Sequence, residues 1–153
     1  LGALPIMRPT AVDLNALVES LVAASPWRHV AIETEPDPAR PTVWADERQL
    51  RRVLRNLLKN ACEAQPAGGR VRIRAARAGD GMASVVVEDE GPGIAPAALA
   101  HIFDTGFTTK KDGSGVGLSV SQRVIEQHGG TIEVNSEPGR GARFTVLLPE
   151  RSA

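Results

Sequence analysis

Residues 50–64 read LRRVLRNLLKNACEA and carry the most regular helical pattern in the chain. The apolar residues recur every three or four positions, as on the buried face of an amphipathic helix. They are Leu50, Val53, Leu54, Leu57, Leu58 and Ala61. Asp46 stands before this pattern as a candidate N-cap, so we predict a helix that ends near Ala64.

The polar side of this predicted helix holds two asparagines, Asn56 and Asn60, with Glu63 close by. Residues four apart project from the same side of a helix. Asparagine is a mediocre helix former. The pair therefore indicates either a functional use or simply a polar face in solvent.

Patterns outside this helix predict a sheet. Alternating apolar and polar residues indicate strands at residues 30–35, 71–75, 83–88, 131–136 and 143–148, with a short strand at 42–44. The sequence AGDG at 78–81 predicts a hairpin turn, and further helices are expected at 13–24, 97–102 and 116–128. Helices and strands mix without strict alternation, which predicts an α/β fold: a two-layer sandwich of a mixed sheet with helices on one face.

Length and composition narrow the function classes. A chain of 153 residues fits one domain, which we place at residues 11–150 between a linker or cloning remnant (1–10) and a polar tail (151–153). Lys and Arg together number 18, equal to Asp and Glu, which gives no support for broad binding to nucleic acid or to an anionic membrane. A single cysteine excludes an internal disulfide framework.

The location expected for this fragment is cytoplasmic. No apolar run approaches the ~20 residues that span a bilayer, and no signal peptide is recognisable. The chain looks like part of a longer protein, and that parent protein could carry a membrane anchor elsewhere.

The stretch KDGSGVGLS at residues 111–119 has glycines at 113, 115 and 117 before a predicted helix. A P-loop would place a lysine directly after its last glycine, and a dinucleotide-binding loop would read GxGxxG after a strand. Neither pattern fits. A phosphate-binding loop at a helix N-terminus and a flexible loop both stay open on this segment alone.

Two further segments contain candidate functional residues. DEGPG at residues 89–93 follows a predicted strand. It is either a tight turn or a carboxylate that accepts from an amino group, with glycines leaving room for a flat ring. HIFDTGFTTKK at 101–111 places two phenylalanines and two lysines just before the glycine-rich loop.

An asparagine helix, DxGxG, a Phe-rich stretch and GxGxGL follow one another in this chain. In order and spacing they resemble the N, G1, F and G2 boxes of the catalytic ATP-binding domain of bacterial two-component sensor histidine kinases. The resemblance covers residues 11–149, including GGTIEVNSEPGRGARFTVLLP near the end. It implies the Bergerat ATP-binding fold. The form TTKKDGSGVGLS is similar to the nitrogen-regulation and related sensor kinases.

The resemblance also implies roles for individual residues. Asn60 would be the Mg²⁺ ligand, Asn56 would line the phosphate region, and Asp89 would read the adenine amino group. Asn56, Asn60 and Lys110 are the expected catalytic residues. The set expected to bind ATP or ADP is Asn60, Asp89, Gly91, Gly93, Ile94, Phe103, Phe107, Thr109, Lys110, Lys111, Gly113, Ser114, Gly115, Val116, Gly117 and Leu118. The phenylalanines could instead pack the base of a lid, and the lysines could be solvated.

The expected reaction is transfer of the γ-phosphate of ATP to a histidine. ATPases and anti-sigma serine kinases of the same superfamily typically carry Glu where this chain has Asn56, and asparagine cannot take a proton. A neutral histidine is already nucleophilic, so it needs little help from a general base. His29, His101 and His128 lack the acidic follower of the family's acceptor. The expected partners are therefore upstream dimerisation and phosphoacceptor helices, and indirectly a response regulator, with no nucleic acid and no direct membrane contact.

Two departures from the family pattern leave alternatives open. Many relatives have Lys or Arg where this chain has Glu63, and the last strand commonly begins Gly-Thr where this chain has Gly141-Ala142. A water could replace the missing hydroxyl. A non-catalytic nucleotide-binding pseudokinase is the main alternative, followed by a superfamily ATPase or serine kinase.

Overall fold

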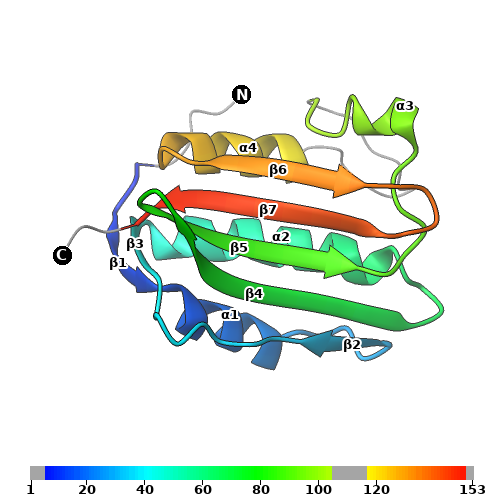
Figure 1. Cartoon of the computed structure of the whole chain (residues 1–153), viewed down its shortest axis with the longest axis horizontal. Helices are drawn as coiled ribbons and strands as arrows, with labels where there is room; N and C mark the ends of the chain where they lie inside the picture. The colour runs from blue at the N-terminus through cyan, green and yellow to red at the C-terminus, as the bar shows by residue number, and fades with distance from the viewer. Residues whose placement is uncertain (1–5, 105–116, 151–153) are drawn as a thin grey trace.

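The structure is a computed structural model, and it describes residues 6–104 and 117–150. Figure 1 shows the arrangement of its helices and strands. In chain order they are β1 (Thr10–Asp13), α1 (Leu14–Ala23), β2 (Val30–Glu33), β3 (Thr42–Ala45), α2 (Glu47–Glu63), β4 (Gly69–Gly79), β5 (Met82–Asp89), α3 (Pro96–Leu99), α4 (Gly117–Gln127), β6 (Thr131–Ser136) and β7 (Ala142–Pro149).

Five strands form the main sheet, in the order β2-β4-β5-β7-β6. β2 pairs with β4 in parallel, and the other neighbours are antiparallel. Helices α1, α2 and α4 lie together behind this sheet in Figure 1. The predicted two-layer sandwich with a mixed sheet is therefore confirmed.

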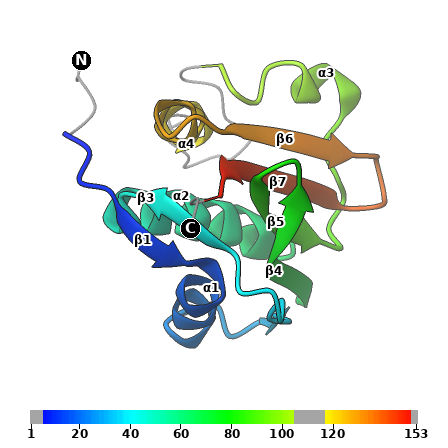
Figure 2. The same ribbon diagram turned by 60° about the vertical axis from the view of Figure 1, so that its left-hand side comes forward.

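A second, two-stranded sheet joins β1 to β3 at one end of the domain (Figure 2). β1 is not predicted from the sequence, because only Val12 of its four residues is buried and no alternation is visible. β1 begins at Thr10, and the Arg8 N–H donates to the Asp46 carboxylate at 2.9 Å. The segment interpreted as a linker thus contacts the domain before residue 11.

The hairpin between β4 and β5 is longer than predicted. β4 extends to Gly79, four residues beyond the expected end, and pairs with β5 from Val71 to Gly79. The turn uses left-handed backbone at Gly79, Asp80 and Gly81, conformations that glycine adopts at little cost and aspartate tolerates. Strand pairing overrides the weak local pattern of ARAG.

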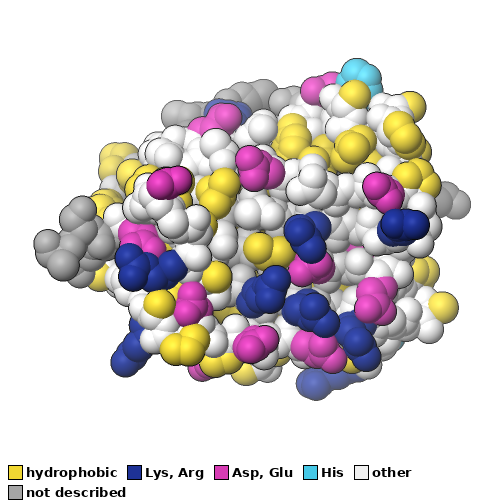
Figure 3. Space-filling model, in the orientation of Figure 1, with side chains coloured by type: hydrophobic (Ala, Val, Ile, Leu, Met, Phe, Trp, Pro, Cys, Tyr) yellow, Lys and Arg dark blue, Asp and Glu magenta, His cyan; other side chains and the backbone are white. Residues whose placement is uncertain are grey.

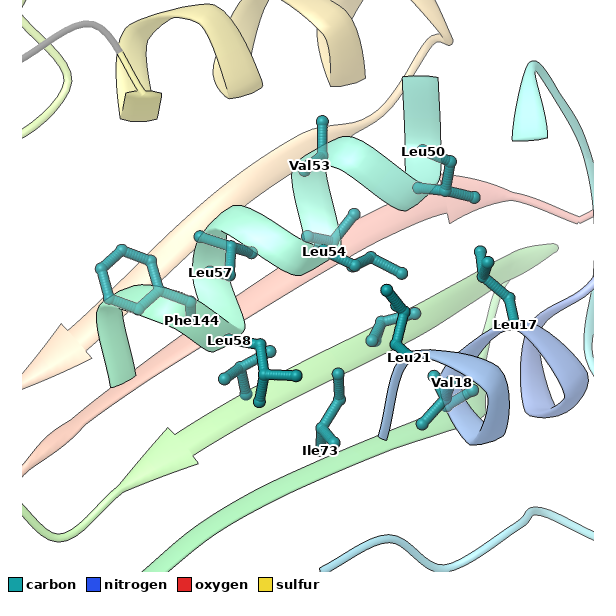
Figure 4. Close-up of a cluster of buried hydrophobic side chains, with 14 of the residues drawn as sticks. Leu17, Val18, Leu21, Leu50, Val53, Leu54, Leu57, Leu58, Ile73 and Phe144 are labelled. Carbon is teal, nitrogen blue, oxygen red and sulfur yellow. The ribbon is translucent and has the colours of Figure 1, made fainter. Parts of the chain in front are cut away.

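The core lies between helices α1, α2 and α4 and the inner face of the sheet. Figure 4 shows Leu54, Leu57 and Leu58 of α2 directed towards the sheet and towards α1. The apolar residues predicted for α2 are all buried, and Cys62 joins them as a small core residue. This packing confirms the predicted buried face of the helix and leaves its other side open to functional use.

The outer face of the sheet carries a row of alternating charges. Register places Glu33 beside Arg72, Arg72 beside Glu88, and Glu88 beside Arg143 on successive strands. The Arg143 guanidinium donates to Glu88 at 3.0 Å. Figure 3 shows both signs interspersed over this face. The face therefore presents no extended patch of one sign. In the described part of the chain, no helix has the length and apolar character needed to cross a membrane.

Leu54→Ala tests the core. Leu54 is 0% exposed, so its truncation leaves a cavity and should lower the free energy of unfolding by about 2–5 kcal/mol. Lys59→Ala on the exposed side of α2 is the control and should change it by less than about 0.5 kcal/mol. Chemical denaturation followed by circular dichroism measures both. Equal effects of the two substitutions would contradict this packing.

Candidate functional site

Asp89 is the last residue of β5 and is half-buried. Its Oδ1 accepts the Gly91 N–H at 2.9 Å, and its carboxylate also accepts the backbone N–H of Ala142. Burial raises the pKa of Asp89 above its ordinary value, and these two hydrogen bonds partly oppose that rise. The site therefore holds a fixed, partly desolvated carboxylate, which favours a hydrogen-bond donor as its ligand.

Close backbone contacts surround this carboxylate. A Cβ at Gly93 would collide with the Glu137 carbonyl oxygen, and one at Gly141 would collide with the Asp89 carbonyl oxygen. Both glycines have positive φ, of 77° and 75°. Glycine is thus required at both positions for sterics and for conformation. The loop after β5 and the loop before β7 can meet only because of these residues.

Ser136 at the end of β6 connects the same two loops and is not among the predicted site residues. Its hydroxyl accepts the Ile94 N–H at 2.8 Å and donates to the Gly141 carbonyl at 2.9 Å. A serine at a strand end carries no distinctive pattern. Only the fold shows that it supports the backbone around Asp89.

The C-terminal end of α2 lies against Asp89. A Cβ at Gly91 would lie 3.1 Å from the Ala64 carbonyl oxygen and equally close to Asp89 Oδ1. Burial, then the charges of Glu63 and Asp89, raise the pKa of the Cys62 thiol to about 11. Cys62 is therefore an inert core thiol at neutral pH. Because the charge of Asp89 acts on this thiol, Asp89 lies beside the last turn of α2.

Asn56, further back along α2, lies against the first turn of α4. A Cβ at Gly117 would be 2.7 Å from Asn56 Nδ2. The same Nδ2 donates to Ser121 Oγ at 3.5 Å. Asn60 is one helical turn further along α2 and is half-buried. Asn56 and Asn60 thus lie on the C-terminal half of α2, and Asp89 lies beside the end of that helix.

The remaining predicted site residues form two groups, those that the structure describes and those that it does not. Ile94, Phe103 and Leu118 are half-buried and pack against the core, which supports the packing role for Phe103. The others lie outside the described residues: Phe107, Thr109, Lys110, Lys111, Gly113, Ser114, Gly115 and Val116.

The histidines are bonded within the domain. His29 Nε2 contacts the Cys62 carbonyl at 3.1 Å, and His101 Nδ1 contacts Asp104 at 2.8 Å. His128 Nδ1 donates to the Val124 carbonyl at 2.7 Å, because its Nε2 accepts the Asp46 N–H at 3.0 Å. These contacts support the structural roles expected from the sequence.

Magnesium was expected at Asn60. Among residues 6–104 and 117–150, no group of three or more His, Cys, Asp or Glu could hold a metal ion. Mg²⁺ usually takes only one or two oxygen ligands from protein and the rest from phosphates and water. A single amide oxygen on a half-buried face of α2 fits that requirement and fits an ion that arrives with a nucleotide.

Comparison with known proteins agrees with this geometry. Residues 45–152 match the model of the family described as histidine kinase-, DNA gyrase B-, and HSP90-like ATPase. The chain belongs to this family. It is 40% identical over 157 residues to the sensor histidine kinase ZraS of Klebsiella oxytoca, covering 95% of this chain and 34% of ZraS. The chain thus spans about a third of the length of that curated relative.

Two solved structures extend the comparison. The nucleotide-free catalytic domain of the histidine kinase ThkA has a TM-score of 0.84 at 30% identity, with 94% of this chain and 97% of that chain covered. Full-length ShkA in complex with AMPPNP has a TM-score of 0.86 at 32% identity, with 99% and 33% covered. The fold is that of a histidine kinase catalytic domain, as the sequence resemblance implies.

Asp89→Asn tests the desolvated carboxylate without any ligand. The pKa of Asp89 is raised above 3.8 in the folded protein, so the folded state binds this proton more tightly than the unfolded state. Its ionisation must then lower the free energy of unfolding as pH rises through the folded pKa. We expect Asp89→Asn to gain stability relative to wild type between about pH 3.5 and pH 7, measured by urea denaturation.

Asp37→Asn is the matched control with the opposite sign. The N–H groups of Ala39 and Arg77 lower the pKa of Asp37, so its ionised form stabilises the fold above the unfolded pKa and this contribution is lost in acid. Asp37→Asn should therefore lose stability relative to wild type as pH rises towards 3.8, the ordinary pKa of this carboxyl, and the difference should change little above about pH 5. Parallel profiles for wild type and Asp89→Asn would rule out the assigned environment of Asp89.

Proposed function

We propose that this domain binds Mg-ATP and donates the γ-phosphate to a histidine on phosphoacceptor helices of the same protein, as the first step of two-component signalling. The observation that carries the proposal is the order of polar groups along α2. Asn56 contacts α4 and Asp89 lies beside the last turn. From residue 56 to residue 63 a helix rises about 10 Å, which leaves room for an extended nucleotide between the two ends.

The base would bind at the Asp89 end. An ionised carboxylate only accepts hydrogen bonds, so it suits the exocyclic amino group of adenine. Gly91 and Gly93 leave the loop after β5 without side chains where the ring approaches. The Ala142 backbone N–H bonds to Asp89, so this strand still orients the carboxylate although it lacks the threonine of many relatives.

The phosphates would bind near Asn56 and the start of α4. Free N–H groups and the helix dipole favour anions at a helix N-terminus. Asn60 would contribute its amide oxygen to Mg²⁺, which would neutralise charge on the β- and γ-phosphates when bound. Lys110, the other lid residues and the glycines at 113 and 115 stay predictions, because they lie outside the described residues.

Transfer of the γ-phosphate would depend mainly on how the domain positions ATP relative to the acceptor histidine. An imidazole nitrogen of the acceptor histidine attacks the γ-phosphorus, the bond to the β-phosphate oxygen breaks, and ADP leaves. The neutral imidazole needs no strong base to attack, so Asn56 need not take a proton. The domain's contribution is alignment and charge stabilisation, as in phosphoryl transfer generally.

The acceptor helices, the response regulator and the domain limits are part of the proposal. ZraS is about three times the length covered here, which is consistent with acceptor and sensor regions outside the aligned part. Residues 11–150 would form the catalytic unit and residues 1–10 the connection to those helices. The internal bonds of the histidines support an acceptor outside this domain.

A pseudokinase is the second candidate, and Glu63 favours it. This exposed carboxylate on the last turn of α2 stands where many relatives carry a cation, and it would repel phosphate. A pseudokinase would bind ATP without transferring phosphate. An ATPase or serine kinase would release phosphate steadily or phosphorylate serine.

Asn60→Ala tests the metal site. Loss of one charge-assisted contact is worth about 1.5–3 kcal/mol, so Mg-ATP affinity should fall about tenfold or more while affinity for ATP in EDTA stays the same. Asn135→Ala, an exposed asparagine on β6, is the control and should change neither. Isothermal titration calorimetry measures both, and equal losses with and without Mg²⁺ would exclude Asn60 as the ligand.

Transfer is tested with the acceptor helices of the parent protein. Radiolabel from ATP should appear on those helices in an acid-labile form and should disappear with Asn60→Ala. Binding without any label would favour the pseudokinase. Acid-stable label or steady release of phosphate would favour the other superfamily members.

A further inference from the structure

We propose that Ser121 is a positioning residue, which acts through Asn56 to hold the first turn of α4 where it meets the phosphates. The inference rests on the proposed function and adds a residue that belongs to none of the sequence motifs. Ser121 is 4% exposed on α4 and cannot contact ligand from the surface.

The Asn56 amide lies across the first turn of α4. Gly117 and Ser121 are four residues apart, so they share one face of this helix. The amide meets both of them: Nδ2 donates to Ser121 Oγ at 3.5 Å, and it lies 2.7 Å from the Cβ position of Gly117. A side chain at Gly117 would therefore displace the amide. This explains the glycine without any appeal to loop flexibility.

The other end of α4 is also bonded to α2. The N–H of Asp46, the N-cap of α2, donates to His128 Nε2 at 3.0 Å. His128 follows α4 and donates to the Val124 carbonyl. Helix α4 is thus bonded to α2 near both of its own ends, and the Asn56–Ser121 contact lies near the end where α4 begins.

Loss of this contact would change the direction of the N–H groups at the start of α4 more than it would change the stability of the fold. The free N–H groups of the first turn point along the axis of α4, so a small tilt of that turn changes where they point. The contact to Ser121 uses the donor end of the Asn56 amide. It thereby fixes the amide and the helix relative to one another, and Ser121 acts on phosphate only through this contact.

Ser121→Ala is the test, in the isolated domain. A long neutral hydrogen bond contributes modestly, so we expect the Kd for Mg-ATP to rise about two- to fivefold. The Kd for adenosine, which has the base but no phosphate, should stay unchanged. In the Asn56→Ala background, Ser121→Ala should not change the Kd for Mg-ATP further, because the contact through which Ser121 acts is already absent.

Ser84→Ala is the matched control. Ser84 is also a buried serine with a 3.5 Å hydrogen bond, donated to the Ala76 carbonyl between β4 and β5. It should leave both dissociation constants unchanged. Thermal unfolding of each variant separates general destabilisation from the effect on phosphate.

The outcomes are distinguishable. Weaker Mg-ATP binding with unchanged adenosine binding supports the positioning role. An unchanged Kd for Mg-ATP overturns it, and so do equal losses for both ligands or an additive double mutant. A wild-type domain that binds neither ligand refutes the proposed function itself, and the inference falls with it.

Discussion

Burial of the apolar face of α2 against the sheet is the constraint on which the molecule depends. Leu54, Leu57 and Leu58 can be removed from water only if the helix takes one rotation about its axis. That rotation turns Asn56 and Asn60 away from the densest part of the core. The same packing brings the last turn of α2 to the end of β5. Core and site are therefore one arrangement, and a change in helix orientation would disturb both.

Much of this arrangement could be predicted from the sequence because its signals are local. The periodicity of residues 50–64 predicts both the helix and its buried side, and the alternation in β6 gives its limits. The four boxes predict the fold through their order. Asn56 and Asp89 are predicted site residues because their motifs resemble those of the family in order and spacing, and the fold places Asp89 beside the helix that carries Asn56.

What could not be predicted depends on contacts between distant segments. β1 has too little buried surface to show a pattern and exists through pairing with β3. Ser136 and Ser121 are ordinary serines whose roles depend on what lies opposite them. The requirement for glycine at Gly93 and Gly141 arises where two loops meet. Such roles come from three-dimensional proximity, which a single sequence does not encode in any short motif.

The alternating charges on the outer face of the sheet limit how this domain can be assembled into a larger protein. A neighbouring domain that covered this face would have to dehydrate Glu33, Arg72, Glu88 and Arg143 together. Removing paired charges from water costs more than their mutual attraction returns unless the geometry is excellent. We therefore expect this face to remain hydrated when the domain packs against other domains.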